Sequence, residues 1–132
     1  MIQNKHAKSF RDLIVYQKAK AVSRKIFELS KSFPKEETYS LTDQMRRSSR
    51  SIGAQIAEAW GKRRYKKHFI SKLTDSDSEQ LETQHWVGDA ADGKYITKVQ
   101  EKDLIERLSE TGRMLNSMMK KADKFCNSDR IQ

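Results

Sequence analysis

Eight lysine and arginine side chains fall within 22 positions in the middle of this sequence, and their type and spacing best indicate a chemical function. They are Arg46, Arg47, Arg50, Lys62, Arg63, Arg64, Lys66 and Lys67. Cations at this density can hold the phosphates of a nucleic acid, and the neighbouring rings of Trp60 and Tyr65 can stack on unpaired bases. No sequence-reading motif accompanies them, so we expect binding led by backbone and shape. The alternative is that these charges keep the helices in solution or pair with carboxylates of the same protein.

The residues that enzymes use for catalysis show no constellation in this sequence. The three histidines, His6, His68 and His85, lie on a predicted tail and on one predicted helix, and no spacing gathers a nucleophile, a base and an orienting group. The glycines are isolated, so no phosphate-cradling loop is present. We interpret Cys126 as a small buried hydrophobe rather than a reactive thiol. The sequence therefore predicts a protein that is not an enzyme and uses no cofactor.

Two acidic patterns resemble metal sites but lack essential ligands. Glu82 and His85 have the Glu-x-x-His spacing of di-metal bundles, which require a second copy of the motif and two further glutamates. Asp75, Asp77 and Glu79 resemble a calcium loop without its central glycine and its terminal glutamate. We therefore predict no metal site and interpret these carboxylates as a solvated face.

The basic residues are placed by the second of four predicted helices. Ser40, with Asp43 three residues on, predicts its start, and Gly61 predicts its end or a kink, which would make the run KRRYKK a basic turn. At 100° per residue one stripe is apolar or small, comprising Leu41, Met45, Ser48, Ile52, Ile56 and Ala59. Arg46, Arg47 and Arg50 fall on the opposite side, so we expect one cationic face.

The other three helices follow from the same periodicity. The first is predicted from near Ser9 to Phe33, with Leu13, Tyr16 and Phe27 off its apolar seam. The third spans about residues 66–91, and its core face carries a polar layer that we expect to hydrogen-bond across the bundle, formed by Ser76, Gln80, Thr83 and Gln84. Thr97 with Gln100 predicts a capping-box start for the fourth helix. These elements predict an all-α fold, an antiparallel up-down four-helix bundle.

Length and composition bound the class of protein. The chain has 132 residues, one proline and one cysteine, which favours one helical domain without a disulfide and a reducing cytoplasm. We expect a basic arm over 1–8, the bundle over 9–126 and a frayed C-terminus over 127–132. No signal-peptide pattern and no membrane-length apolar run is present, so we expect no contact with membranes.

The charge is unevenly distributed along the chain. Residues 1–72 hold 18 of the 27 lysines and arginines but only 6 of the 18 acidic residues. This asymmetry favours a polyanionic partner or complementary faces between subunits.

Two faces that the predicted core does not use suggest self-association. The third helix carries an acidic strip formed by Asp75, Glu79, Glu82, Trp86 and Asp89. The second helix carries a complementary surface formed by Arg50, Gly53, Ala54 and Ala57. Different flanks that meet head to tail can close into a ring, so we predict a cyclic homo-oligomer with Arg50 and Glu82 as the pair between subunits.

Several segments carry a family resemblance. The run RRSSRSIGAQIAEAWGKR, with DLIVYQKA and FPKEETYSL before it and SEQLETQ after it, resembles the bacterial four-helix-bundle proteins encoded in 23S rRNA intervening sequences. Gly53 stands where that family has proline, and Ala59 where it has glycine. The family is similar to accessory proteins of diversity-generating retroelements, which are cyclic pentamers that work beside a reverse transcriptase and its RNA. The resemblance implies a non-enzymatic pentamer with RNA as its first ligand.

Two functional hypotheses remain at this point. The first is an oligomeric accessory protein that binds RNA, or single-stranded DNA as second choice, through its basic residues. The second is an oligomeric scaffold whose charges serve self-assembly and a protein partner, without functional contact to nucleic acid.

Overall fold

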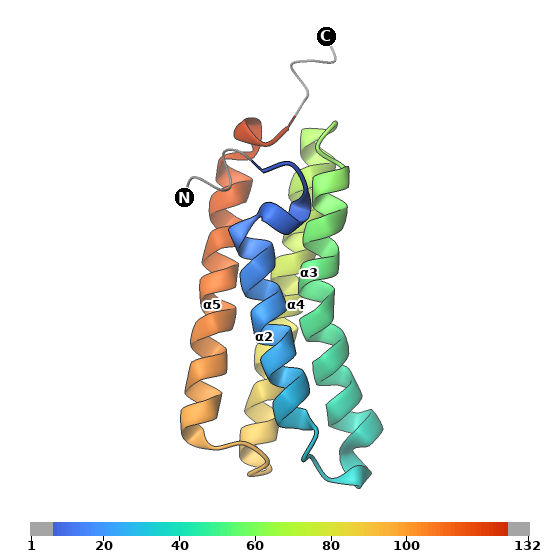
Figure 1. Cartoon of the computed structure of the whole chain (residues 1–132), viewed down its shortest axis with the longest axis vertical. Coiled ribbons are helices and arrows are strands. Elements are labelled where there is room, and N and C mark those ends of the chain that lie inside the picture. The colour runs from blue at the N-terminus through green and yellow to red at the C-terminus, as the bar shows by residue number, and fades with distance from the viewer. Residues whose placement is uncertain (1–6, 127–132) are drawn as a thin grey trace.

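The computed structural model describes residues 7–126, which form four long antiparallel helices (Figure 1). They are α2 (Ile14–Ser30), α3 (Asp43–Gly61), α4 (Lys66–Asp92) and α5 (Lys98–Lys120). Helix α3 packs against α2 and α4, and α5 closes the bundle against α4 and α2. The predicted four-helix bundle is therefore confirmed. The predicted basic arm and frayed C-terminus lie almost entirely outside the described residues.

The start of the first long helix differs from the prediction. Ser9 does form a capping box with Asp12, but the box caps a single 3-10 turn, η1 (Phe10–Asp12). Leu13 then adopts an extended conformation, with φ −69° and ψ 131°, and α2 begins at Ile14. This break turns Leu13 into the core, where it is 1% exposed, so its predicted place off the apolar seam is wrong.

The predicted cap at Ser40 is also wrong. A 3-10 turn, η2 (Lys35–Glu37), leads into a π-helical turn, η3 (Thr38–Thr42), and α3 begins only at Asp43. The Ser40 hydroxyl donates to Glu37 Oε1 at 2.6 Å instead of capping a helix. Glu37 Oε2 accepts from the Tyr95 hydroxyl at 2.8 Å. One carboxylate thus joins the α2–α3 connection to the α4–α5 connection, and these two hydrogen bonds lower the pKa of Glu37.

The core contains the expected periodic side chains. Its largest fully buried members are Leu13, Val15, Val22, Ile26, Met45, Ile52, Ile56, Phe69, Leu73, Leu104, Leu108 and Leu115. Thr97 and Gln100 form the predicted capping box at the start of α5. No helix within 7–126 is long and apolar enough to cross a membrane.

A buried polar layer joins α3 to α4, as predicted. The Ser76 hydroxyl donates to the Ile52 carbonyl at 2.8 Å. The Thr83 hydroxyl donates to Ser48 Oγ at 2.8 Å, and both of these residues are fully buried. The Thr83 hydroxyl also lies 2.8 Å from the Glu79 carbonyl of its own helix. A shift in helix register would separate the partners on α3, and a buried hydrogen bond that is lost costs stability. The layer therefore specifies how α3 lies on α4.

A companion set of amides joins α4 to α5. Gln84 Nε2 donates to Gln80 Oε1 at 2.8 Å and lies 3.4 Å from Ser109 Oγ. Gly112 makes room for this set, because a Cβ there would lie 2.7 Å from Gln80 Nε2.

Replacing Thr83 by valine removes one buried hydroxyl without changing the side-chain volume. We expect Thr83→Val to lower the free energy of unfolding by about 1–2 kcal/mol, because Ser48 Oγ loses a donor in a dry interface. The double variant Ser48→Ala/Thr83→Val should cost less than the sum of the single changes. Urea denaturation measures both. Thr74→Val, the same change at an exposed site of α4, is the control, and strict additivity would contradict the coupling.

Candidate nucleic-acid and assembly surfaces

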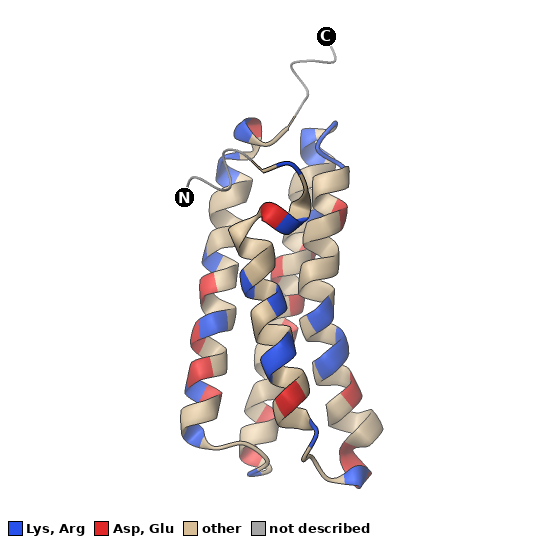
Figure 2. Cartoon of the chain, viewed as in Figure 1, with Lys and Arg blue, Asp and Glu red and all other residues tan. Residues whose placement is uncertain are grey.

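One end of the bundle gathers most of the cations of the predicted binding site. The α3–α4 turn lies there beside the start of α2 and the end of α5 (Figure 1). We call the segments 8–12, 62–67 and 120–124 the basic end. Its lysines and arginines are Lys8, Arg11, Lys62, Arg63, Arg64, Lys66, Lys67, Lys120, Lys121 and Lys124, against the acidic residues Asp12 and Asp123. Figure 2 shows the resulting cluster of positive residues at this end.

The five cations of the α3–α4 turn divide into two groups. Lys62, Arg64 and Lys67 are exposed and form no ion pair within the described residues. Lys66 pairs with Asp123 at 2.8 Å. Arg63 stacks on the Trp60 ring, 3.5 Å from its centre, and its Nε donates to the Trp60 carbonyl. We therefore count the first three as available for a ligand.

Tyr65 places an aromatic ring among these cations. Its side chain is 55% exposed. The Arg64 guanidinium lies 5.9 Å from the centre of the ring, and the His68 ring lies 5.3 Å from it. An exposed ring between cations can stack on a base whose phosphates the cations hold.

The three arginines of α3 do not form the predicted single cationic face. Arg46 turns toward α2, where its Nε donates to Ser30 Oγ at 2.8 Å. Arg46 and Arg50 lie 4.6 Å and 5.3 Å from the centre of the Phe27 ring. Arg47 turns toward α4 and donates to Glu82 Oε2 at 2.7 Å. The reason is that α2 covers one flank of α3 and α4 covers the other, which a helical wheel of α3 alone does not show.

Much of the predicted acidic strip on α4 has cationic partners inside the same chain. Glu82 Oε2 accepts from Arg47 and also from Trp86 Nε1, at 2.9 Å. Lys72 lies 3.0 Å from Glu58 and 3.6 Å from Asp75. The alternative interpretation of the basic residues, pairing with carboxylates of the same protein, therefore holds for Arg47. The individual pairs were not predicted, although charges spaced along neighbouring antiparallel helices are a signal for them. An Arg50–Glu82 pair between subunits stays a prediction.

Two glutamates of the strip have opposite pKa shifts. The hydrogen bond from Trp86 and those from Arg47 lower the pKa of Glu82. Burial raises the pKa of Glu79 above its ordinary value, although Arg47 opposes the shift. Glu79 Oε1 lies 3.8 Å from Arg47 Nη1, beyond hydrogen-bond distance, and is buried without a hydrogen bond in the described residues.

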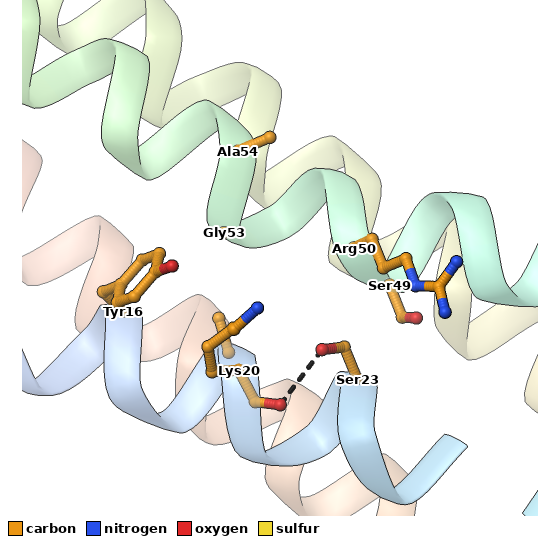
Figure 3. A pocket seen from close by; sticks show the side chains of 8 residues that line it. Tyr16, Lys20, Ser23, Ser49, Arg50, Gly53 and Ala54 are labelled. Carbon is orange, nitrogen blue, oxygen red and sulfur yellow. Dashed lines mark hydrogen bonds between the residues drawn. The ribbon is translucent and has the colours of Figure 1, made fainter. Parts of the chain in front are cut away.

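The predicted surface of small residues on α3 is partly covered. Gly53 is buried, and a Cβ there would lie 3.4 Å from Cε1 of Tyr16 on α2. Its predicted place on an open face is wrong, because α2 packs over it. Ala54 is exposed and Ala57 is half-buried. A groove remains between the two helices beside Gly53 (Figure 3).

The residues with catalytic or metal-binding chemistry are scattered. No group of three or more His, Cys, Asp or Glu side chains within 7–126 is placed to hold a metal ion. His85 lies 3.4 Å from Asp89 and packs edge-on against Trp86. Cys126 is half-buried, and burial raises the pKa of its thiol, which makes it a weak nucleophile.

Comparison with known proteins connects this arrangement to one family. The family model of the 23S rRNA-intervening sequence protein matches residues 11–117, from η1 nearly to the end of α5. The chain belongs to the 23S rRNA-intervening sequence protein family. A protein of unknown function from the S23 ribosomal protein family of Bacteroides thetaiotaomicron VPI-5482, solved by crystallography, is similar at TM-score 0.73 and 30% identity. The similarity covers 81% of this chain and 96% of that one. No curated protein matches the chain.

The Glu82 contacts of this 23S rRNA-intervening sequence protein should make its stability pH-dependent. The pKa of Glu82 is lower in the folded chain than in the unfolded chain. The Glu82 contacts therefore stabilise the fold at pH values above the unfolded pKa of about 4.3, and this stabilisation is lost as the pH falls through the pKa of the folded chain. We expect Glu82→Gln to lower the free energy of unfolding at pH 7 by about 0.5–1 kcal/mol, with a gap that closes near pH 3. Urea denaturation at both pH values measures it.

Glu79→Gln is the matched control, because the pKa of Glu79 is raised and its fold favours the neutral form. This variant should be as stable as the wild type or more stable at pH 7. A Glu82→Gln deficit that persists unchanged at pH 3 would contradict the assigned charge effect.

Proposed function

We propose that this chain is a non-enzymatic accessory protein that binds RNA, with single-stranded DNA as second choice, through its basic end. The observation that carries the proposal is the α3–α4 turn, where Lys62, Arg64 and Lys67 are exposed without a carboxylate partner in the described residues. Tyr65 adds a ring exposed among them. The family description, 23S rRNA-intervening sequence protein, supports RNA as the first choice.

The shape of the turn favours an unpaired strand or loop over a regular duplex. The turn is a short convex connection between two helix ends, and long cationic side chains fan out from it toward several phosphates. The Tyr65 ring can stack only on a base that is free of its partner. Because the contacts are to phosphates and ring faces, the binding depends strongly on salt and weakly on sequence.

Removing the three available cations should weaken binding without unfolding the protein. For wild type, neutralising about four phosphates gives a slope of log affinity on log salt of about −3 to −4. The variant Lys62→Ser/Arg64→Ser/Lys67→Ser should flatten this slope by about 2 to 3 units and keep the wild-type melting temperature, because exposed unpaired charges contribute little to folding. Fluorescence anisotropy with a short single-stranded RNA at several salt concentrations measures it.

The matched control removes the same charge from the opposite end of the bundle, as Lys94→Ser/Lys98→Ser/Lys102→Ser, whose lysines are all exposed. It should bind nearly as the wild type does, apart from a small loss from net charge. Equal losses in the two variants would show that total charge, and not the basic end, drives binding. If the wild type does not bind the RNA at low salt, the proposal is wrong.

We also propose that the chain associates with copies of itself into a cyclic homo-oligomer, with five subunits implied by the family resemblance. The supporting observation is that Asp75 and Asp89 on α4 and Arg50 and Ala54 on α3 are exposed, so the two predicted faces keep opposite charges at the surface. Opposite charges on two different flanks favour head-to-tail contact between copies. Arg50, Ala54 and Ala57 are the accessible part of the predicted complement. A scaffold for a protein partner is the alternative function of such an assembly.

Reversing one exposed charge of the acidic strip should loosen this assembly. We expect Asp75→Arg to raise the subunit dissociation constant by about tenfold, since like charges across an interface repel. The lost contact with Lys72 should cost little, because Lys72 keeps Glu58. Glu106→Arg, at an exposed site of α5, should leave association unchanged. Light scattering measures both, and a monomeric wild type at tens of micromolar would end the proposal.

A further inference from the structure

A groove of about 210 Å³ lies between α2 and α3, along the side of the bundle rather than at its basic end (Figure 3). Its walls carry polar side chains from both helices, namely Tyr16, Lys20 and Ser23 of α2 with Ser49 and Arg50 of α3. The groove exists because Gly53 and Ala54 present almost no side chain on α3. Tyr16 closes one end of the groove by packing its ring against Gly53.

The two cations at this groove lack the carboxylate partners that neighbouring lysines have. Lys18 and Lys25 of α2 lie 3.2 Å and 2.9 Å from carboxylates of α5. Lys20, which projects across the gap toward α3 in Figure 3, and Arg50 form no ion pair within the described residues. Lys20 thus reaches the groove from α2, and Arg50 lines it from α3 with its guanidinium directed along α3, 5.3 Å from the centre of the Phe27 ring (Figure 3). Two cations at one small groove favour a ligand with two negative charges.

The hydroxyls of the groove specify the rest of the ligand. Ser23 Oγ donates to the Lys20 carbonyl at 3.0 Å, and Ser49 Oγ donates to the Arg46 carbonyl at 3.1 Å. Because both hydrogens are used, each oxygen offers a ligand only an acceptor, and Ser23, 8% exposed, is more accessible than Ser49, 1% exposed. Both serines are buried. The groove therefore suits a ligand that has hydroxyl donors as well as an anionic group.

We propose that this groove binds a sugar phosphomonoester, with the phosphate between Lys20 and Arg50 and sugar hydroxyls toward Ser23 and Ser49. A phosphomonoester carries nearly two charges at neutral pH, whereas each phosphodiester of a nucleic-acid backbone carries one. The site is thus distinct in chemistry from the basic end. Two sources offer this group: a free sugar phosphate, or the 5′-terminal nucleotide of an RNA.

Titration of the full chain with ribose 5-phosphate tests the site, with ribose as the uncharged comparison. Ribose 5-phosphate should bind the wild type, and ribose should not. Lys20→Gln and Arg50→Gln should each weaken the binding of ribose 5-phosphate by about tenfold or more, because each variant loses one charged hydrogen bond to the ligand. Lys102→Gln, at an exposed site of α5, is the matched control and should bind as the wild type does. Isothermal calorimetry and the ³¹P chemical shift give the affinities.

A steric variant separates the groove from general charge attraction. Ala54 is exposed and lines the groove, so Ala54→Leu should fill it without changing any charge. This variant should abolish ribose 5-phosphate binding while circular dichroism and melting temperature stay at wild-type values. Because Arg50 and Ala54 also belong to the predicted interface between copies, the titrations are run where sedimentation shows one assembly state for all variants.

Oligoribonucleotides of one sequence, with either a 5′-phosphate or a 5′-hydroxyl, distinguish the two sources. If the 5′-phosphate raises the affinity of the wild type for RNA, and Lys20→Gln removes this increase, an RNA end is a ligand. If ribose 5-phosphate binds but the 5′-phosphate does not raise the affinity for RNA, the ligand is a small molecule. Ribose 5-phosphate should bind the Lys62→Ser/Arg64→Ser/Lys67→Ser variant normally, so failure of the basic end would leave this result intact. No binding of ribose 5-phosphate at millimolar concentration, or equal binding to wild type, Lys20→Gln and Ala54→Leu, would overturn the proposal.

Discussion

The contact between α3 and α4 is the constraint on which the rest of the structure depends. The Ser76 and Thr83 hydroxyls have partners on α3 in this register. A shifted register would take the α3 carbonyl from Ser76 and leave Thr83 only the Glu79 carbonyl of its own helix, and each lost buried hydrogen bond costs about 1 kcal/mol. A short connection joins the two helices. Fixing the register of α3 and α4 therefore also fixes the position of the α3–α4 turn and of the cations that it carries.

The same packing sorts the cations of α3 by their neighbours. Arg47 falls on the α4 side and finds Glu82, while Arg46 and Arg50 fall on the α2 side over Phe27. Beyond the helix end, Lys62 and Arg64 are exposed and form no ion pair within the described residues. Charge density along the sequence therefore overstates the available charge. The cations that can bind a ligand are those without a carboxylate partner in the bundle, and they lie at the basic end and along the α2–α3 groove.

Periodicity predicted the helices and the core well, because burial of one stripe is a property of each helix alone. The capping box at Thr97 was predicted for the same reason. Ser9 and Ser40 misled, since a serine followed by an acid three residues on also suits a single 3-10 or π-helical turn. The Arg47–Glu82 pair and the cover of Tyr16 over Gly53 were missed, because a helical wheel shows a face but not which neighbouring helix lies over it.

The place where a nucleic acid contacts the protein is the most direct test of the proposed role of the basic end. Amide chemical shifts of the labelled full chain, followed during titration with a short single-stranded RNA at low salt, locate that contact residue by residue. We predict that the largest changes fall in 62–67, with smaller changes in the adjoining segments 8–12 and 120–124, and that 94–102 at the opposite end stays unchanged. Changes confined to 94–102, or spread evenly over the surface, would contradict it.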